Sequence, residues 1–442
     1  MKIWLINPYD ELPGEGPEQR YGCLARMLSE RGHEVVWISS AFRHRRKEKI
    51  RSTSLLQVEF ERGVHDPGSV DSSSPACMKS GRAGSETLGA ELPGGMSRKP
   101  GIRKLLLVDA PGYRKNVSVH RLWSQWKWGR NVEWDMTRRV ESGEVAKPDV
   151  VLASTPPLEG ALAGLRLADT FGATSVVDVM DDWPETWLQA LPDGVVWRWA
   201  GRMLLWPWTR LARRVLSRAD AVSAQSGRFA RRARELGHEG AVHVCYLGGG
   251  RVDSGRKFAK DPRFHPIYLG AMGRFYDIEC VLQTARTAKN QGLDWRWTLV
   301  GEDPEGKWAE AARAYGVSDC VECPGYLQGG VLEERLGRAH VGLVPMDPRS
   351  GVSVPYKVGD YLGAGLPVVG SLPGELETLL RESGAGGFYR FGDSDSLLEA
   401  LKPYAEASDV YRRASNAAGD LYQRCFNREV IYGKFADWVT GL

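Results

Sequence analysis

The chain of 442 residues lacks any apolar run approaching the ~18 residues that a membrane-spanning helix needs. It opens directly on a strand pattern, MKIWLINPYD, without the apolar core and cleavage site of a signal peptide. Its seven scattered cysteines suggest no disulfide framework, and the one CxxC pair, Cys320 and Cys323, has no second pair of ligands beside it. We therefore expect a cytoplasmic protein rather than a secreted or membrane-spanning one.

Metal sites and nucleophile triads are also missing from the pattern. The eight histidines do not cluster with carboxylates at ligand spacing, and no Gly-x-Ser-x-Gly or Ser-His-Asp arrangement stands out. Asp393 and Asp395 resemble a DxD metal motif, but their position before SLLEAL favours a helix N-cap. The net charge of +4 is modest and no motif for RNA or DNA accompanies it. We expect no metal, no cofactor and no nucleic-acid partner.

What is present is a globular composition, with 42% hydrophobic and 26% charged residues over a length that suits two or three domains. Strand and helix patterns alternate from KIWLIN through a helix over about 20–31 to EVVWISS, and again from PDVVLAST to TSVVDVMDD. The alternation restarts after about residue 250 with HPIYLGAMG, a helix over 278–290 and WRWTLVG. This predicts an α/β fold of two doubly wound, Rossmann-like domains that face each other across a ligand cleft. Residues 66–101 interrupt the pattern, since 18 of these 36 positions are Gly, Ser or Pro, and we expect a flexible insertion there.

A glycine-rich turn, PGEG, follows the first strand and contains Gly14 and Gly16. Such a turn lets a phosphate or a sugar oxygen approach backbone amides at the start of the next helix, although a plain connecting loop has the same composition. The turn is not G-x-G-x-x-G, and no acidic residue ends EVVWISS. A dinucleotide-dependent dehydrogenase is therefore disfavoured.

The segment from Val354 to Gly370, VPYKVGDYLGAGLPVVG, carries the most chemistry. Pro355 is suited to begin a helix, Lys357 falls in its first turn, and Asp360 follows three residues later on the same face. A cation and a carboxylate placed in this way suit a diphosphate and a ribose or sugar hydroxyl. A surface i,i+3 ion pair would have the same spacing.

Three carboxylates, Asp178, Asp181 and Asp182, follow a buried strand in VVDVMDDWPE, at the end of the sheet where catalytic groups gather. Carboxylates this close do not all ionise readily, so we expect at least one pKa to rise, which suits a group that accepts a proton from an acceptor hydroxyl. Glu185 is compatible with such a role and equally with capping the next helix.

Many of the 16 tryptophans lie among arginines, in 121–134 and 197–216. On a helical wheel of 197–216, one stripe is expected to face the core: Trp197, Leu204, Trp208, Leu211 and Val215. Another face mixes tryptophans and arginines and is our candidate for the membrane and acceptor: Trp199, Arg202, Trp206, Arg210 and Arg213. Pro207 is expected to kink or divide the helix. Such a face is typical of a helix in the interface of an anionic membrane, although a solvated charged face has the same pattern.

The segment PYKVGDYLGAGLPVV resembles the nucleotide-sugar segment of the retaining GT-B glycosyltransferases of family 4, especially their WbuB-like branch. MKIWLINPYDELPGEGPEQRYGCLARMLSERGHEV, STPPLEGALAGLRLA, VVDVMDDWPE, YLGAMGRFYDIECVLQTA and WTLVGEDPEG follow the order of that family, over nearly the whole chain except 66–101. The resemblance implies a GT-B fold in which 1–248 binds the acceptor, 249–420 binds the nucleotide sugar, and a last helix in 421–442 crosses back to the first domain.

The resemblance also implies the activity, which is transfer of a hexose from a UDP- or GDP-linked donor to a lipid-linked saccharide in the biosynthesis of a bacterial surface polysaccharide such as lipopolysaccharide. With the tryptophan-rich face, it implies a cytoplasmic enzyme bound peripherally to the inner face of the cell membrane. Family members use a Glu near the donor sugar, but Val352 stands at that position, so Ser350 or Ser353 is expected to take its place. Asp360 matches the residue that contacts the ribose of the donor.

The family's Arg and Lys that hold the diphosphate are displaced as well, because Ala271 and Asp277 stand at their positions. The resemblance therefore assigns the diphosphate to Arg274 and Lys357, and the acidic position before Trp-Pro-Glu to Asp181. The remaining donor-binding residues are expected among glycines of the matching loops, namely Gly14, Gly16, Gly273 and Gly301. In the implied reaction these cations and the helix start near Pro355 stabilise the leaving diphosphate while an acceptor hydroxyl attacks from the same face.

Two other functions remain open at this stage. A nucleotide-sugar 2-epimerase of the same fold would act on the donor alone. A non-catalytic partner protein with this fold would explain why Val352 replaces the expected carboxylate.

Overall fold

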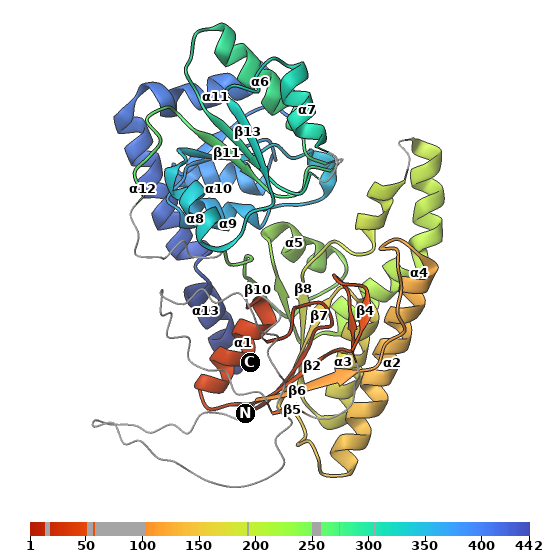
Figure 1. The fold of residues 1–442 in the computed structure, drawn as a ribbon. Helices are drawn as coiled ribbons and strands as arrows, with labels where there is room; N and C mark the ends of the chain where they lie inside the picture. The colour runs from red at the N-terminus through yellow and green to blue at the C-terminus, as the bar shows by residue number, and fades with distance from the viewer. Residues whose placement is uncertain are drawn as a thin grey trace, which may run out of the picture.

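The computed structural model places two α/β domains one above the other, with both chain termini in the first domain (Figure 1). It describes residues 1–13, 18–50, 56–57, 103–191, 194–249, 258–273, 275–303 and 306–442. The stretch 66–101, predicted to be a flexible insertion, lies outside these residues.

The first domain surrounds an eight-stranded sheet of order β10-β9-β8-β7-β1-β2-β6-β5, in which only the β5–β6 pair is antiparallel. The strands of the sheet are β1 (Lys2–Ile6), β2 (Glu34–Ser40), β5 (Leu56–Gln57), β6 (Arg103–Val108), β7 (Val150–Thr155), β8 (Thr174–Val179), β9 (Ala221–Ala224) and β10 (Ala241–Val244). A short antiparallel pair, β3 (Phe42–Arg43) and β4 (Glu48–Lys49), lies beside it. In β1, Trp4 and Ile6 enter one core and Ile3 and Leu5 enter the other, so both faces of the sheet are buried. Burial on both faces explains the continuous apolar run of this strand.

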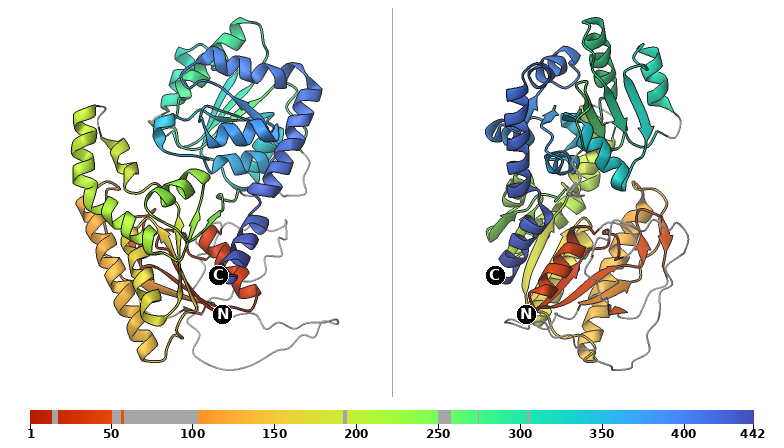
Figure 2. Two further views of the ribbon diagram at one scale, coloured as in Figure 1. Left: turned by 180° about the vertical axis from the view of Figure 1, so that it is seen from behind. Right: turned by 60° about the vertical axis from the view of Figure 1, so that its left-hand side comes forward.

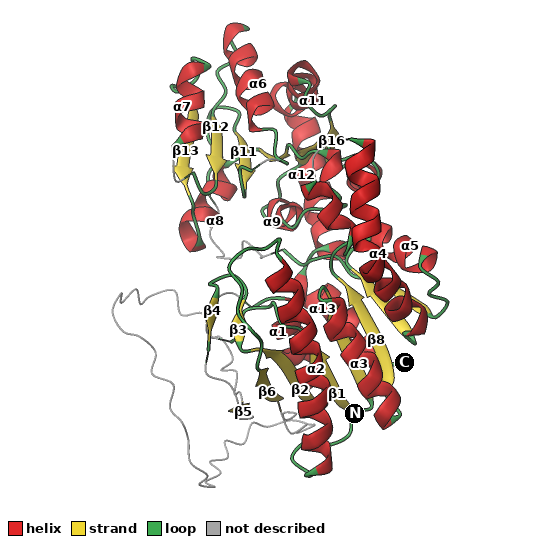
Figure 3. Ribbon diagram, turned by 90° about the vertical axis from the view of Figure 1, so that its right-hand side faces the viewer, coloured by secondary structure: helices red, strands yellow, loops and turns green. Residues whose placement is uncertain are grey.

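Helices cover the two faces of this sheet (Figure 3). One core takes residues from α2 (Val119–Glu141), α3 (Leu158–Phe171), α4 (Val195–Arg218) and α5 (Gly227–Glu235), while α1 (Arg20–Glu30) packs into the other. A short 3₁₀ helix, η1 (Glu185–Ala190), leads from β8 toward α4.

The second domain contains a six-stranded, fully parallel sheet of order β13-β12-β11-β14-β15-β16. Its strands are β11 (Pro266–Leu269), β12 (Trp297–Val300), β13 (Val321–Gly325), β14 (Val341–Val344), β15 (Val368–Gly370) and β16 (Gly386–Phe388). Its helices are α6 (Ile278–Asn290), α7 (Lys307–Ala314), α8 (Gly329–Arg338), the 3₁₀ turn η2 (Pro348–Ser350), α9 (Lys357–Gly363), α10 (Glu375–Ser383) and α11 (Ser394–Glu406). Asp393 caps α11 by accepting the Ser396 N–H at 2.8 Å, as the sequence predicted.

The chain returns from the second domain to the first through α12 (Ser408–Cys425) and α13 (Arg428–Thr440), and α13 lies beside α1 (Figure 2). Phe435 of α13 is buried in the same core as Leu24 of α1. Where the linker between the domains passes α9, a Cβ on Gly249 would lie 2.3 Å from the carbonyl carbon of Gly359, so only glycine permits this close approach. The linker is therefore in direct contact with α9.

Candidate functional site

The second domain has its topological switch point between β11 and β14, and ligands of doubly wound sheets bind outside the carboxyl ends of such strands. Lys357, the first residue of α9, reaches this point and is only 8% exposed. Gly270 lies directly after β11, and a Cβ on this residue would be 2.9 Å from the Nζ atom of Lys357. The Nζ atom donates to the Tyr268 hydroxyl at 3.1 Å and lies 4.2 Å and 4.3 Å from the ring centroids of Tyr268 and Tyr276.

The ammonium of Lys357 forms no ion pair with any residue in the described part of the chain. Burial lowers its pKa to about 7. A buried ammonium without a counter-ion costs free energy, and a phosphate oxygen is a ligand that restores the charge balance. Because α9 has only seven residues, the ammonium rather than the helix end supplies the positive charge here.

Two further predicted donor residues lie near Lys357. Asp360 is half-buried one turn later on α9, close enough to Tyr356 and Arg428 for electrostatic interaction. Ser353 is half-buried and donates its hydroxyl to Glu375 Oε2 at 2.7 Å. Val352, at the position where the resemblance led us to expect a carboxylate, packs against the apolar core of this domain.

Glu375, which the sequence analysis did not identify, links the two domains. From the start of α10 it accepts the backbone N–H groups of Gly227 and Arg228 at 2.6 Å and 3.0 Å, and the Tyr246 hydroxyl at 2.8 Å. Burial acts to raise the pKa of this carboxyl, but the hydrogen bonds outweigh it and hold the pKa below its usual value. No local motif marks this residue, because its partners in the first domain, Gly227, Arg228 and Tyr246, are more than 100 positions away.

The structure describes only some of the glycines predicted to bind the donor, and it does not describe the predicted arginine. Gly14, Gly16 and Arg274 lie outside the described residues. Gly273 is exposed, with open space where a Cβ would stand. Gly301 follows β12, and a Cβ there would lie 2.1 Å from the carbonyl oxygen of Gly270, so this glycine permits close packing of the loops that form the switch point.

The first of the three clustered carboxylates is not available for chemistry. Asp178 is fully buried and forms a bidentate ion pair with Arg20, with Nε–Oδ2 and Nη2–Oδ1 distances of 2.8 Å and 2.9 Å. Arg20 is 158 positions away in the sequence, so the local pattern did not show this ion pair. The raised pKa expected for at least one of the three carboxylates is found at Asp181. The ion pair of Asp178 with Arg20 stabilises the centre of the first domain instead.

Asp181 lies just beyond β8 and is the carboxylate with the perturbed environment. Its Oδ1 accepts the Thr186 hydroxyl and the Asp182 N–H, both at 2.8 Å. Burial raises the pKa of Asp181, and the neighbouring charge of Asp182 contributes less. Asp182 itself forms an ion pair with Arg228 at 3.2 Å. Glu185 is hydrogen-bonded to Arg232, and burial raises its pKa.

An aromatic cluster near Asp181 was missed by the sequence analysis. Tyr9 and Tyr113 follow β1 and β6 of the large sheet, and His44 follows β3 of the short antiparallel pair. The ring centroid of His44 lies 4.9 Å from that of Tyr9 and 5.8 Å from that of Tyr113. The guanidinium of Arg121 lies 5.8 Å from the ring centroid of Tyr9 and 5.3 Å from that of Trp183. Burial, aided by the charges of nearby Lys47 and Arg121, lowers the pKa of His44 to about 4. The one signal that the sequence offered for Tyr9, His44 and Tyr113 was that each of them follows a strand.

The tryptophan and arginine face of α4 is exposed. Trp199 is 64% and Trp206 58% exposed, and the predicted arginines of this face, Arg202, Arg210 and Arg213, are exposed as well. The guanidinium of Arg210 lies 5.4 Å from the ring centroid of Trp206. None of the helices in the described ranges is both long enough and apolar enough to cross a membrane.

The predicted core stripe of α4 was wrong at its N-terminal end. Trp197 is 56% and Leu204 72% exposed, whereas Trp208, Leu211 and Val215 do contact the core. The N-terminal turns extend past the sheet (Figures 1 and 2). There Gly201 packs against Leu188 and Leu191, and the core of the sheet does not reach Trp197 and Leu204. Pro207 lies inside α4, which is not divided at this position.

Comparisons with known proteins agree with this architecture. Residues 265–406 match the sequence profile of a family described as glycosyl transferases group 1. A search of curated protein sequences found no match. The chain is similar over its whole length to the structure of a sucrose-phosphate synthase from Thermosynechococcus elongatus, with 14% identity, 98% of that chain covered and a TM-score of 0.64.

Two further solved structures are similar over the whole of this chain. HepE of Anabaena, in complex with UDP, has 12% identity, 100% coverage and a TM-score of 0.62. The lipopolysaccharide outer core galactosyltransferase WaaB has 12% identity, 99% coverage and a TM-score of 0.58. These likenesses and the two parallel sheets confirm the predicted fold class, the GT-B fold of two Rossmann-like domains.

Proposed function

We propose that this protein is a retaining glycosyltransferase of the family 4 type, WbuB-like branch, which transfers a hexose from a nucleotide-sugar donor to a lipid-linked saccharide. The observation that carries this proposal is the buried ammonium of Lys357 at the switch point of the second domain, without a counter-ion among the described residues. It lies within the segment that matches glycosyl transferases group 1. A UDP-linked donor is favoured over a GDP-linked one because the similar HepE structure contains UDP.

On the donor side, Lys357 binds the diphosphate and stabilises the negative charge that develops as the bond from sugar to phosphate breaks. Its contacts with two tyrosines fix the ammonium in place before the donor arrives, so little reorganisation is needed during the reaction. Asp360 is positioned on α9 for a ribose hydroxyl, and Ser353 takes a polar contact with the donor sugar in the absence of a carboxylate at Val352.

On the acceptor side, Asp181 accepts the proton of the attacking hydroxyl, because its raised pKa makes the carboxylate a better base than an exposed Asp. In the aromatic cluster beside Trp183, the half-buried rings of Tyr9 and His44 are the ones that a saccharide can contact. The hydroxyl attacks from the face of the leaving group, so the configuration of the sugar is retained and no covalent nucleophile is needed. We propose that no metal ion takes part.

The exposed tryptophans and arginines of α4 support peripheral binding to the inner face of the cell membrane, where a lipid-linked acceptor for a surface polysaccharide would be found. The similarity to WaaB is consistent with a role in such biosynthesis, including that of lipopolysaccharide.

A thermal-shift panel of UDP, GDP, ADP, CMP and their common sugars tests the donor site. A ligand at 100 times its Kd should stabilise the protein by about 2.7 kcal/mol, with or without EDTA. Product analysis with the preferred donor and lipid-linked saccharides then tests transfer, and the anomeric configuration of the product tests retention. Conversion of the donor alone would favour the 2-epimerase, and no shift with any nucleotide would contradict the proposal.

A further inference from the structure

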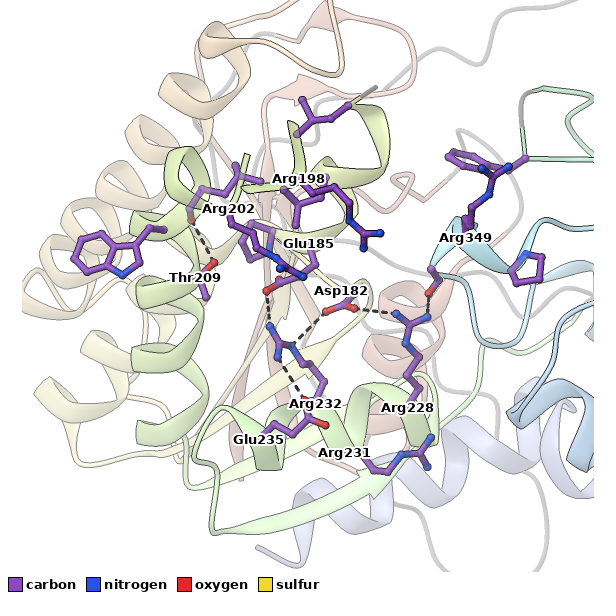
Figure 4. Close-up of a pocket in the computed structure, with 18 residues that line it drawn as sticks. Asp182, Glu185, Arg198, Arg202, Thr209, Arg228, Arg231, Arg232, Glu235 and Arg349 are labelled. Atoms are coloured by element: carbon purple, nitrogen blue, oxygen red, sulfur yellow. Dashed lines mark hydrogen bonds and ion pairs between the residues drawn. The ribbon is translucent and has the colours of Figure 1, made fainter. Parts of the chain in front are cut away.

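A cavity of about 810 Å³ lies between the domains, on the side of Asp182 that faces α4 and α5 (Figure 4). Side chains from α4, α5 and η1 line it from the first domain, and Phe275 and the turn containing Arg349 line it from the second. Six arginines surround it, which we call the arginine pocket: Arg198, Arg202, Arg228, Arg231, Arg232 and Arg349.

The arginine pocket carries more positive charge than its own acidic residues balance. Among the described residues, three carboxylates line it, those of Asp182, Glu185 and Glu235, and all three pair with Arg228 or Arg232. The guanidinium groups of Arg198, Arg202 and Arg231 form no hydrogen bond or ion pair with any residue that the structure describes. Planar guanidinium groups bind phosphate oxygens in a bidentate manner, so the unbalanced set suits a phosphate or diphosphate.

This pocket adjoins the donor segment, because Phe275 and Gly351 line it, but it does not contain the cation of the donor site. Lys357, Asp360 and Ser353 do not line it, whereas Asp182, next to the candidate base Asp181, does. A phosphate held by Arg198 and Arg202 would therefore belong to a molecule whose attached group reaches Asp181 from the acceptor side.

The lining face of α4 adjoins its exposed apolar face. Arg198, Arg202, Leu205 and Thr209 line the pocket at helical spacing, while Trp199, Met203 and Trp206 follow each of the first three by one residue. Trp206 belongs to both sets, because it lines the pocket and is 58% exposed. An apolar chain attached to a bound phosphate would leave the pocket directly along exposed tryptophans.

We propose that the arginine pocket binds the phosphate or diphosphate that joins the acceptor saccharide to its lipid, with the lipid chain leaving along the tryptophan face of α4. This inference rests on the proposed function, which it deepens by assigning a site to the acceptor. The juxtaposition of unpaired arginines, a neighbouring catalytic carboxylate and an exposed apolar helix face fits a lipid diphosphate better than a soluble anion, which would make no use of the tryptophans.

The test compares three double variants with the wild type. Arg198→Gln with Arg202→Gln removes two unpaired guanidiniums. Trp199→Ser with Met203→Ser, called the tryptophan variant, removes two exposed apolar side chains that do not line the pocket. Arg286→Gln with Arg313→Gln is the control. The control pair is exposed in the second domain and changes the charge equally. The probes are phosphatidylcholine vesicles with and without a minor fraction of polyprenyl diphosphate, inorganic diphosphate, and UDP.

We expect the wild type and the control to bind the vesicles that contain polyprenyl diphosphate, and the arginine variant to lose roughly tenfold or more in affinity. The tryptophan variant should lose affinity for these vesicles but keep its affinity for inorganic diphosphate. All variants should keep the thermal shift with UDP.

Unchanged vesicle binding by the arginine variant would overturn the proposal. Loss of the UDP shift in that variant would assign the pocket to the donor instead, and equal binding of inorganic diphosphate and lipid would identify a soluble anion as the ligand. If neither the wild type nor any variant shows a thermal shift with UDP while the vesicle results are as expected, the glycosyltransferase proposal fails and the lipid site stands.

Discussion

Replacing Lys357 with methionine should stabilise the ligand-free protein and at the same time remove its affinity for nucleotide. Burial lowers the pKa of this lysine from 10.5 to about 7, and since one pKa unit corresponds to about 1.4 kcal/mol, the buried ammonium costs roughly 5 kcal/mol. The contacts with the rings of Tyr268 and Tyr276 return about 1 kcal/mol each. Methionine has nearly the same shape and no charge, so we expect a net gain of about 1–3 kcal/mol near neutral pH.

The gain depends on pH in a defined direction. The folded state of the wild type binds fewer protons than the unfolded state between pH 7 and 10.5, so its stability rises with pH in this window. The methionine variant lacks this dependence, and its advantage should be largest below pH 7 and vanish toward pH 10.5. For the wild type, affinity for UDP should fall roughly tenfold per pH unit above 7, because the diphosphate requires the ammonium form.

Thermal and urea unfolding at several pH values, with and without UDP, measure both effects. Lys402→Met is the matched control, because Lys402 is paired with Glu399 on the surface of α11, and it should change neither stability nor UDP binding appreciably. A methionine variant that binds UDP as well as the wild type, or one that is less stable at pH 6, would refute the assignment of Lys357 as a buried, unpaired donor-binding cation.

Three further predictions concern the first domain and its contact with the second. Asp181→Asn should lower kcat by about 100-fold or more with UDP affinity unchanged, whereas the control Asp395→Asn, at an exposed residue, should have no effect. Because burial raises the pKa of Asp181, the acid limb of the wild-type rate profile should lie above pH 3.8. A wild-type-like kcat in the Asp181 variant would exclude Asp181 as the base. Glu375→Gln should lower the free energy of unfolding in urea at pH 7 by about 1–3 kcal/mol, because the carboxylate accepts four hydrogen bonds. The pKa of Glu375 in the folded protein is below 4.5, so the wild type should lose its greater stability as the pH falls through this folded-state pKa. Equal stabilities of the two proteins at pH 7 would contradict the interdomain role. Arg20→Met should lower the free energy of unfolding by about 3–5 kcal/mol, because it leaves Asp178 buried and unpaired, and adding Asp178→Leu should recover most of this loss. If urea unfolding finds the Arg20→Met variant as stable as the double variant, this explanation is wrong.

Local patterns predicted the elements well where one residue's neighbours in sequence decide its structure. The expected helix over 278–290 is α6, and the helix expected over about 20–31 is α1, Arg20–Glu30. Asp393 was predicted to cap a helix, and its side chain does so. These features depend on apolar periodicity and on capping within a few residues, which the sequence displays directly.

Contacts between distant segments were beyond such patterns. The ion pair of Arg20 with Asp178 removed one of three carboxylates that looked equivalent in VVDVMDDWPE, and Glu375 gained its role from the start of α5, nearly 150 positions earlier. Trp197 and Leu204 fit a core stripe by helical spacing, yet the end of α4 that carries them lies beyond the core of the sheet and packs on η1 instead. A helical wheel gives the direction of a side chain but not what lies there.

The alternation of strands and helices, the two-domain α/β fold and the importance of the segment around Lys357 and Asp360 could be predicted from local patterns, because hydrophobic period, glycine turns and motif spacing are local properties. Which charges are paired depends instead on the folded chain. Burial and distant partners set the environment of each ionisable group, so the ammonium of Lys357 without a counter-ion among the described residues, the ion pair of Asp178 with Arg20 and the unbalanced arginine pocket are properties of the two domains in their folded arrangement.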